Sequence, residues 1–250
     1  MTNLGTLGGT WSYAYGINDA GQIVGNSQRI IDSINGPWPY GSSFLYQGGT
    51  MQDLGAPPCC GTNNGARGIN NAGQIVGGYY YGAYLYSGGL FTTLSQIGAY
   101  GINNAGQVVF DSNATSWPYA HAFLYSGGIS IDLGTLGGTS SDGTGINDAG
   151  QVVGYSSTAA NTAVHAFLYF GGIMTDLNSL LPANSGWQLE YAEAINNSGQ
   201  IVGYGQFNNG AYHAFLLDTG DASVPEPDSL ELLGAAAALF VMRRVGRQDL

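Results

Sequence analysis

Short apolar runs alternate with turn residues along most of this chain, and one ten-residue phrase occurs five times. The first copy is Gly16–Gly25 (GINDAGQIVG), and the others begin at Gly68, Gly101, Gly145 and Ala194, 33 to 52 residues apart. A repeat of this size is typical of solenoids and propellers, in which neighbouring units bury one another's apolar faces.

Each copy predicts a β-hairpin. Its Asn-Asp/Asn-Ala/Ser-Gly segment combines an Asn that bonds its own backbone with a Gly that adopts positive φ, and a β-branched strand follows. A third strand recurs as Phe-Leu-Tyr or a close variant, and in the first four copies a Gly-Gly pair predicts the turn into a fourth strand. Four short strands per repeat are the signature of a propeller blade, whereas a solenoid would need shorter and more regular periods.

The two ends of the repeat region are predicted to share one blade. Asn3–Gly9 (NLGTLGG) matches Asp132–Gly138, so we interpret it as a fourth strand, while His213–Asp218 ends the region on a third strand. Pairing them would remove open sheet edges. We therefore predict an all-β fold, a five-bladed β-propeller of four-stranded repeats closed by the N-terminal strand. A chain that has lost upstream repeats would also begin in mid-repeat, and this alternative stays open.

The composition narrows the class of protein. Charged residues make up 8% of the 250, the formal net charge is −11, and there is no Lys. Only Arg29 and Arg67 are basic before the C-terminal tail, so the basic surface that binds phosphates is missing and we expect no nucleic-acid partner. So low a charge content is more familiar in exported bacterial proteins than in cytosolic ones.

Candidate catalytic and metal-binding residues are few. The three His residues stand at one equivalent position in separate repeats, so we interpret them as hydrogen-bonded structural residues: His121, His165 and His213. Asp19 and Asp148 occupy turn positions where other copies have Asn, and no calcium-loop pattern surrounds them. Adjacent Cys59 and Cys60 are interpreted as an incidental loop pair. We predict no catalytic residue, no metal site and no cofactor.

Glu190 and Glu193 are the only Glu residues of the repeat region and share one short predicted strand. Their positions alternate between opposite faces of that strand, which disfavours the paired carboxylates of a glycosidase. The sequence therefore predicts a protein that is not an enzyme.

Two sets of residues are candidates for contact with a ligand. The position just before the repeated Gly-Ile-Asn (Ala-Ile-Asn in the last copy) changes character from copy to copy and is expected to face the axis, as a solvated wall or a small-ligand mouth: Tyr15, Arg67, Tyr100, Thr144 and Glu193. Trp-Pro-Tyr recurs at 38–40 and 117–119, which we place in loops between second and third strands. Aromatic rings on loops stack against sugars, so Trp38, Tyr40, Trp117 and Tyr119 are the candidate glycan-binding residues. The alternative is that they cover a blade edge.

The repeat resembles a known family. His-Ala-Phe stands at 121–123, 165–167 and 213–215, and with the Gly-Ile-Asn-x-x-Gly-Gln-x-Val-Gly phrase it resembles the HAF-repeat family of bacterial extracellular proteins over roughly residues 1–218. The first two repeats have Ser42-Ser43-Phe44 and Gly82-Ala83-Tyr84 instead, so the His is dispensable to the fold. The resemblance implies an exported repeat protein.

The C-terminal tail has a different character. A Pro-Glu-Pro motif, an apolar stretch from Leu230 to Met242 and two arginines follow one another, with the motif and basic residues being Pro225, Glu226, Pro227, Arg243 and Arg244. This order resembles the PEP-CTERM sorting signal of Gram-negative, polysaccharide-producing bacteria, which implies recognition by an exosortase-type enzyme. The positive-inside rule would keep the arginines cytoplasmic. The alternative is a terminal helix packed on the repeats.

These observations predict three segments: a repeat propeller at 1–220, a linker at 221–229, and a hydrophobic sorting helix with a basic tail at 230–250. We expect an exported, non-enzymatic protein of the cell surface or exopolysaccharide matrix, attached to the membrane through the helix before processing. A lectin-like glycan-binding propeller is the alternative, with exopolysaccharide as the ligand. Met1–Leu4 has neither a basic nor an apolar signal region, so no signal peptide is visible.

Overall fold

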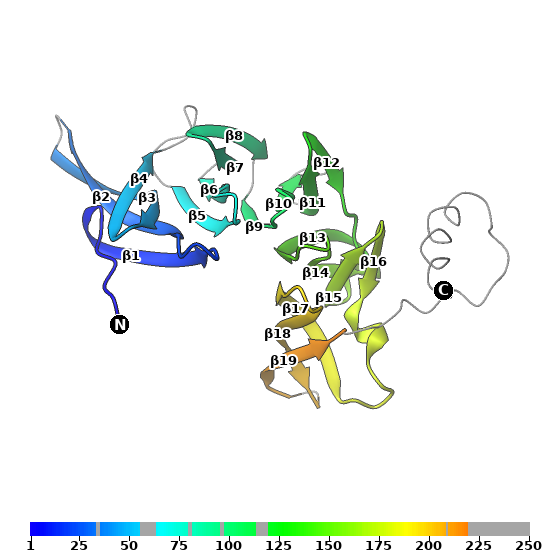
Figure 1. Ribbon diagram of the computed structural model, residues 1–250. Helices are drawn as coiled ribbons and strands as arrows, with labels where there is room; N and C mark the ends of the chain where they lie inside the picture. Colours follow the sequence, from blue (N-terminus) through cyan, green and yellow to red (C-terminus); the bar gives the residue numbers. More distant parts are fainter. Residues whose placement is uncertain are drawn as a thin grey trace, which may run out of the picture. The chain divides into compact units, whose positions relative to one another are not determined.

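Five antiparallel sheets follow one another along the described part of the chain (Figure 1). The computed structural model describes residues 1–33, 36–55, 64–79, 82–95, 98–113, 120–208 and 210–219. The repeat region forms one unit, Met1–Asp218. The predicted linker at 221–229 and helix at 230–250 lie outside the described residues.

Each sheet is a meander in which consecutive strands pair. Sheet 1 holds β1 (Gly8–Ile17), β2 (Ile23–Ser33), β3 (Gly36–Gln47) and β4 (Thr50–Gly55). Sheet 2 holds β5 (Asn64–Ile69), β6 (Ile75–Tyr79), β7 (Gly82–Ser87) and β8 (Leu90–Ser95). Sheet 3 holds β9 (Ala99–Ile102), β10 (Val108–Asn113), β11 (Ala120–Ser126) and β12 (Ile129–Asp132).

The last two sheets differ from each other in strand number. Sheet 4 holds β13 (Gly137–Ile146), β14 (Val152–Thr158), β15 (Val164–Phe170) and β16 (Ile173–Asp176), with the short 3₁₀ helices η1 (Ala159–Asn161) and η2 (Leu177–Leu180). Sheet 5 holds three strands, β17 (Trp187–Ile195), β18 (Gln200–Phe207) and β19 (Tyr212–Asp218). The predicted repeat of four-stranded antiparallel sheets is confirmed for the first four units.

The repeated phrase forms the turn between the first two strands of every sheet. In the first copy the Gly21 N–H donates to the Asn18 carbonyl at 2.9 Å, the Asn18 N–H donates to the Gln22 carbonyl at 3.1 Å, and Gly21 has φ +72°. The same pair of backbone bonds closes the other four copies. Positive φ explains why Gly ends this turn.

The apolar core lies between consecutive sheets. Val24 of β2 packs with Ala66 and Ile69 of the next sheet, and Val153 of β14 packs with Ala192 of β17. Two equivalent clusters join sheet 2 to sheet 3 and sheet 3 to sheet 4. Each sheet therefore covers the face of its neighbour, as the repeat pattern predicts.

The prediction that Asn3–Gly9 adds a fourth strand to the last sheet is wrong in this structure. Leu7 instead forms a parallel bridge with Arg29 of sheet 1, and sheet 5 keeps three strands. The matching residue Leu136 forms the same kind of bridge with Thr158 of sheet 4.

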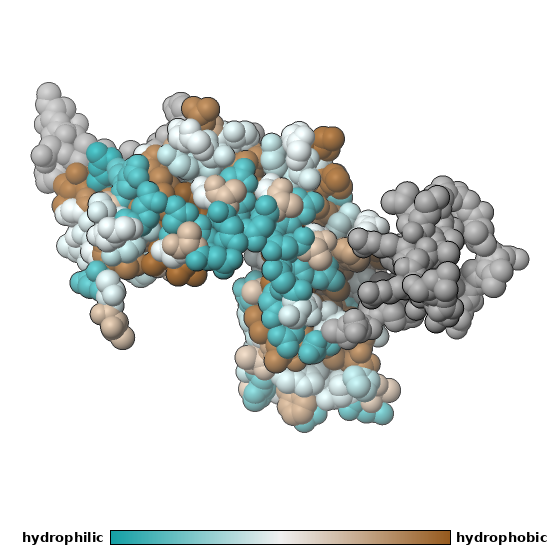
Figure 2. All heavy atoms as spheres, viewed as in Figure 1, coloured by the Kyte–Doolittle hydropathy of each residue, from teal (hydrophilic) through white to brown (hydrophobic). Residues whose placement is uncertain are grey.

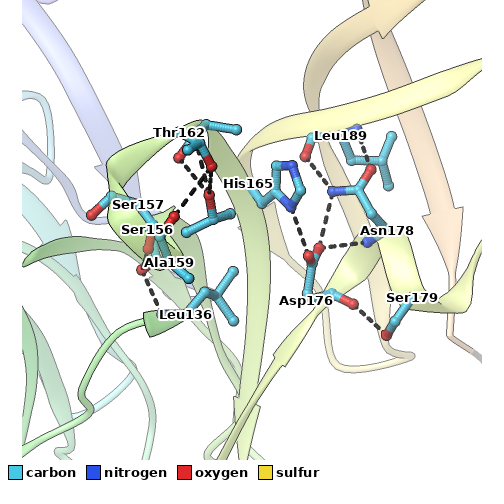
Figure 3. Close-up of polar contacts among 12 residues, drawn as sticks. Leu136, Ser156, Ser157, Ala159, Thr162, His165, Asp176, Asn178, Ser179 and Leu189 are labelled. Carbon is cyan, nitrogen blue, oxygen red and sulfur yellow. Dashed lines mark hydrogen bonds and ion pairs between the residues drawn. The ribbon is translucent and has the colours of Figure 1, made fainter. Parts of the chain in front are cut away.

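The prediction is wrong because the segment that Asn3–Gly9 matches is not itself a fourth strand. In sheet 3 the fourth strand is Ile129–Asp132, so the matched segment Asp132–Gly138 begins where that strand ends. Its backbone is bonded to the next sheet, because the Leu136 N–H donates to Ser156 Oγ at 2.9 Å (Figure 3). The Leu7 N–H donates to Ser27 Oγ at the same distance, 2.9 Å. Asn3–Leu7 therefore has the conformation of the link that precedes sheet 4, and Gly8 and Gly9 already belong to β1.

Candidate binding site on the inner strands and their turns

The first strands of the five sheets are neighbours in space. β1 contacts β5, β5 contacts β9, β9 contacts β13, and β13 contacts β17. We call these five adjoining first strands the inner strands. Residues at matching positions on these strands are therefore brought together across repeats.

The variable position before the repeated Gly-Ile-Asn brings side chains of neighbouring repeats together. The Arg67 guanidinium lies 5.8 Å from the centre of the Tyr15 ring and 5.4 Å from the centre of the Tyr100 ring. Thr144 Oγ1 donates to the Ala192 carbonyl at 2.7 Å. Stacking of Arg67 on two rings stabilises a cation that has few acidic neighbours on the inner strands.

The five turns at the ends of these strands surround one pocket of about 310 Å³. Each repeat contributes one Ile, one Asn and then one Asn or Asp to its lining. In Figure 2 hydrophilic residues form a continuous band over the region where β5, β9 and β13 lie in Figure 1. The lining therefore combines the amide and carboxylate groups of ten residues with five Ile side chains.

The first Asn of each turn links its sheet to the next. Asn18 Nδ2 donates to the Asn70 carbonyl at 3.1 Å, and Asn70 Nδ2 donates to the Asn103 carbonyl at 3.0 Å. Asn103 Nδ2 continues to Asn147 at 3.0 Å, and Asn147 Nδ2 to Asn196 at 3.1 Å. We call this series of bonds the asparagine ladder.

A second series runs beside the ladder at the next turn position. The Asp19 N–H donates to Asn71 Oδ1 at 3.0 Å, and the Asn71 N–H donates to Asn104 Oδ1 at 2.8 Å. The Asn104 N–H and side-chain amide both donate to Asp148, at 2.8 and 2.9 Å. These bonds from Asn104 hold the pKa of Asp148 below its usual value, because they favour the ionised carboxylate.

The sequence indicated only part of this role. The prediction that Asn and Asp occupy turns is confirmed, because Asn70 Oδ1 accepts from the Ala72 and Gln74 backbone N–H groups at 3.1 and 2.9 Å. The bonds between repeats were missed. Their signal was that Asn stands first in all five copies while the next position accepts either Asn or Asp.

A buried pair of carboxyl groups lies between sheets 3 and 4. Asp111 of β10 is 1% exposed, and its carboxyl forms hydrogen bonds with the side chains of Asp142 and Tyr100. Asp111 Oδ1 also accepts from the Gly143 N–H at 3.1 Å. Asp142 in turn bonds to Tyr155, its cross-strand partner. The four side chains form one hydrogen-bonded cluster, which we call the carboxyl–tyrosine cluster.

Burial dominates the protonation of this cluster. It raises the pKa of Asp111 to about 8, with a further rise from the nearby Asp142 charge. Burial also raises the pKa of Asp142, of Tyr100 and of Tyr155. Asp111 is therefore protonated at neutral pH and donates a hydrogen bond instead of carrying a charge.

Aromatic rings continue from this cluster into sheet 5. Tyr155 contacts Tyr191 edge to face at 4.8 Å between ring centres, and Tyr191 stacks on Tyr204 at 4.7 Å. Tyr212 Oη then donates to Glu190 Oε2 at 2.8 Å, which raises the pKa of Tyr212. Glu190 is 6% exposed whereas Glu193 is exposed, so the two Glu side chains of β17 lie in different surroundings.

Sequence reasoning missed this cluster too. The residue that follows the repeated phrase is Asn26, Gly78, Asp111, Tyr155 or Tyr204, so a carboxylic acid appears in one repeat only. In the same repeat Phe110 replaces the closing Gly of the phrase. These two departures were the available signal, but they do not reveal that Asp142 of the next repeat faces Asp111.

Two of the three histidines have the structural role that was predicted. His121 Nδ1 lies 2.9 Å from Asp132 Oδ2, and His165 Nδ1 lies 2.6 Å from Asp176 Oδ2. Asp176 also accepts from Asn178, whose side chain pairs with the Leu189 backbone of sheet 5 (Figure 3). The third, His213, contacts the Trp187 and Phe207 rings. None of the three converges on another.

The prediction that the Trp-Pro-Tyr segment of the first repeat lies in a loop is wrong. Trp38, Pro39 and Tyr40 lie within β3 and pair with Ile31, Ile30 and Arg29 of β2. The two strands extend beyond the length of their equivalents, which carries the segment into the sheet. Tyr40 is half-buried. Trp117 and Tyr119 lie outside the described residues.

Other predicted features also fall outside the described part of the chain. They include Cys59, Cys60 and the whole sorting motif with Pro225, Glu226, Pro227, Arg243 and Arg244. Among the described residues, no group of three or more His, Cys, Asp or Glu side chains is placed to hold a metal ion. No helix within those residues is long and apolar enough to span a bilayer.

Comparison with known proteins finds likeness in structure alone. No family model matches the chain, and no curated protein matches it. The β-propeller domain of the Trilobed protease from Pyrococcus furiosus, which has an open velcro topology, is 7% identical with a TM-score of 0.48 over 84% of this chain and 83% of that one. A gluconolactonase-like protein is 10% identical with a TM-score of 0.39, over 72% of this chain and 71% of that one.

A third similar structure is dipeptidyl peptidase 4 from Porphyromonas gingivalis, 11% identical with a TM-score of 0.43. The match covers 80% of this chain but 33% of that protein. The prediction that the chain is not an enzyme is contradicted by these neighbours, because each bears an enzyme's name. At these identities and TM-scores, the likeness assigns neither an activity nor a ligand to this chain.

Proposed function

We propose that this chain is an exported repeat protein of the bacterial cell surface or exopolysaccharide matrix, sorted through its C-terminal segment. The observation that carries the proposal is the order of the tail: Pro225–Pro227, an apolar stretch to Met242, then Arg243 and Arg244. This order begins just after the last strand ends at Asp218. An exosortase-type enzyme is the proposed partner of the tail, which would hold the protein at the membrane until it is processed.

The chemistry of the repeat region supports a role outside the cell. Its sheets are joined by ladders of mostly amide hydrogen bonds and by apolar contacts, and the described residues contain one Arg–Asp ion pair and two His–Asp contacts. Salt weakens surface ion pairs, but it has little effect on the stability that amide hydrogen bonds and apolar burial provide. Such a fold suits surroundings in which the salt concentration varies. We further propose that the five sheets are five blades of a β-propeller whose first strands lie along its axis.

The sorting role is tested by following the protein in a bacterium that makes exopolysaccharide. Deletion of Val224–Leu250 is expected to release the protein from the envelope, as measured by fractionation and immunoblotting. Pro225→Ala combined with Pro227→Ala should have the same effect, while Ser229→Ala is the matched control and should not. Unchanged envelope retention after the deletion would show that this segment does not sort the protein.

Glycan binding is a second candidate function, favoured by the polar pocket among the five turns. Its amide and carboxylate lining offers both donors and acceptors to sugar hydroxyls, and the exposed Tyr13 and Tyr15 on β1 offer rings to sugar faces. The proposed glycan contact therefore includes the inner strands as well as the Trp-Pro-Tyr segments.

Titration with exopolysaccharide fragments tests this candidate. Asp19→Asn combined with Asp148→Asn introduces the residue that other repeats already carry, so folding should be preserved while sugar affinity falls several-fold. Trp38→Ala combined with Trp117→Ala tests the segments named from the sequence. Binding that neither pair changes would contradict the proposal that glycans bind through these residues.

A further inference from the structure

One contact between sheets is repeated four times in the described chain. A Val on the second strand of each sheet enters the next sheet beside its first strand, where an Ala or Gly leaves room. Val24 meets Ala66, Val76 meets Ala99 and Val153 meets Ala192 in shared clusters. At the remaining contact a Cβ on Gly143 would lie 2.3 Å from Val109 Cγ2, so the same Val fills the same place.

Among the residues that the structure describes, nothing covers this face of sheet 5. Four of the equivalent Val side chains are 0% exposed: Val24, Val76, Val109 and Val153. Val202 of β18 is 45% exposed, and Leu216 of β19 is 65% exposed although its counterparts Leu85 and Leu124 are buried. The contrast arises because no further sheet follows β19 in the described chain.

Sheet 1 presents the opposite side of the same contact. Ala14 of β1 is exposed, whereas Ala66, Ala99 and Ala192 are each 0% exposed. Ile17 is 67% exposed, whereas Ile69 at the same position of sheet 2 is 8% exposed. Sheet 1 thus exposes the residues that receive a Val in every other repeat.

The asparagine ladder ends in complementary groups at the same two sheets. Asn196 Nδ2 donates to Gln200 Oε1 of its own turn and, among the described residues, to no carbonyl of another sheet. At the other end, the Asn18 carbonyl accepts from its own Gly21 and from no Asn of another described turn. A hydrogen bond from Asn196 Nδ2 to an Asn18 carbonyl would extend the asparagine ladder by one more bond of the same kind.

We propose that sheet 5 of one copy of this chain docks on sheet 1 of a second copy, head to tail. Val202 and Leu216 would cover Ala14 and Ile17, and Asn196 Nδ2 would donate to the Asn18 carbonyl. A second copy is the occupant because its first sheet carries the matching surface, and because the substantial contacts between sheets in the described chain all join consecutive sheets. Such a contact uses different surfaces on the two partners and so can continue from copy to copy.

The test measures the mass of the full chain by light scattering and sedimentation at several protein concentrations. The wild type is expected to show a concentration-dependent mass above the 25.9 kDa of one chain. Val202→Asp and Ala14→Asp each remove one side of the contact, so each variant alone should be a monomer. Ile129→Asp changes a 67% exposed residue outside the contact and is the matched control that should behave as the wild type.

Mixing the two variants gives the decisive result. Val202→Asp keeps an intact sheet 1 and Ala14→Asp keeps an intact sheet 5, so their equimolar mixture should form a dimer of about twice 25.9 kDa and nothing larger. Circular dichroism must show that both variants are folded. A monomeric wild type, which would indicate closure within one chain, overturns the proposal. Association that survives both substitutions, as the C-terminal tail would produce, overturns it as well.

Discussion

The first Asn of each turn forms hydrogen bonds with both the oxygen and the nitrogen of its side-chain amide. Asn103 is 3% exposed, and its Oδ1 accepts from the Ala105 and Gln107 N–H groups at 3.1 and 2.9 Å. Its Nδ2 donates to Gln107 Oε1 at 2.7 Å and to the Asn147 carbonyl at 3.0 Å. One residue therefore closes its own turn and joins its sheet to the next.

Asn103→Ala should consequently destabilise the fold by about 2–3 kcal/mol, because it leaves several buried backbone groups without partners. Asn196→Ala removes the same turn bonds but no bond to a later sheet, and should cost about 1 kcal/mol less. Chemical unfolding of both variants gives the difference. Equal losses would show that the bond between sheets adds nothing to stability.

The carboxyl–tyrosine cluster should make stability depend on pH. The folded pKa of Asp111 is raised to about 8, whereas an unfolded Asp titrates near ~3.9. The folded state therefore binds the proton more tightly, and the stability that the protonated carboxyl supports is lost as the pH rises from about 4 through about 8.

Thermal unfolding between about pH 5 and about pH 9 should show a midpoint that falls by several degrees for the wild type. Asp111→Asn keeps a neutral hydrogen-bonding side chain and should flatten this dependence. Asp19→Asn alters an exposed turn carboxylate and is the control that should preserve the slope. A midpoint that rises across this pH range would contradict the assignment of Asp111 as a buried acid.

At the scale of elements, the closing Gly of the repeated phrase is explained by strand packing. A Cβ on Gly154 of β14 would lie 2.0 Å from the Asp142 carbonyl oxygen of β13 and 2.9 Å from the Phe167 ring. The equivalent Gly25, Gly77 and Gly203 meet the same obstacle from the adjacent strand's backbone. These glycines allow the first two strands to lie against the third strand's aromatic residue.

Gly154→Ala should therefore destabilise the protein by about 3 kcal/mol through overpacking. Gly171→Ala is the matched comparison, since Gly171 has φ +61° but no atom within 4 Å of its added Cβ. That change should cost about 1 kcal/mol, from the left-handed backbone alone. Denaturant unfolding measures both, and a larger loss for Gly171→Ala would contradict the packing explanation.

The link between sheets is a second element with its own stabilising bonds. Ser141 Oγ donates to the Gly134 carbonyl at 2.6 Å, and Ser12 Oγ donates to the Gly5 carbonyl at 2.7 Å. Thr135 and Thr6 each bond to the carbonyl three residues later, at 2.9 Å in both cases. The N-terminal segment therefore folds as a link even though no described strand precedes it.

At the scale of the whole molecule, the stability of the fold depends little on ion pairs. Its described residues form one Arg–Asp ion pair, Arg29–Asp53, and two His–Asp contacts, His121–Asp132 and His165–Asp176, while the net charge of the whole chain is −11. Raising NaCl from about 0.05 M to about 0.5 M screens the mutual repulsion more than it weakens these few pairs.

The midpoint of thermal unfolding should thus change by less than about 3 °C over this range, with any change upward. Differential scanning calorimetry at constant pH is the measurement. A fall of several degrees would mean that ion pairs contribute more to stability than the described contacts indicate.

Much of the fold could be predicted from local patterns. The turn at Asn18–Gln22 and its four copies, and the β-branched strands that follow, depend on residues adjacent in the chain. The N-terminal segment was misassigned because its sequence match to Asp132–Gly138 was correct but said nothing of where β12 ended. The sequence pattern predicts a loop at Trp38–Tyr40, whereas the long β2–β3 pair includes this segment with its Pro39.

The amino-acid sequence by itself determined the repeating unit, because propensity, turn chemistry and apolar periodicity act between residues close in the chain. Only the tertiary structure decided which groups meet across repeats. Asp111 and Asp142, 31 positions apart, share a hydrogen bond because sheets 3 and 4 pack face to face. Val202 and Ala14 are exposed for the complementary reason: burial in a repeat array depends on a neighbour, and these residues lie where the described array has none.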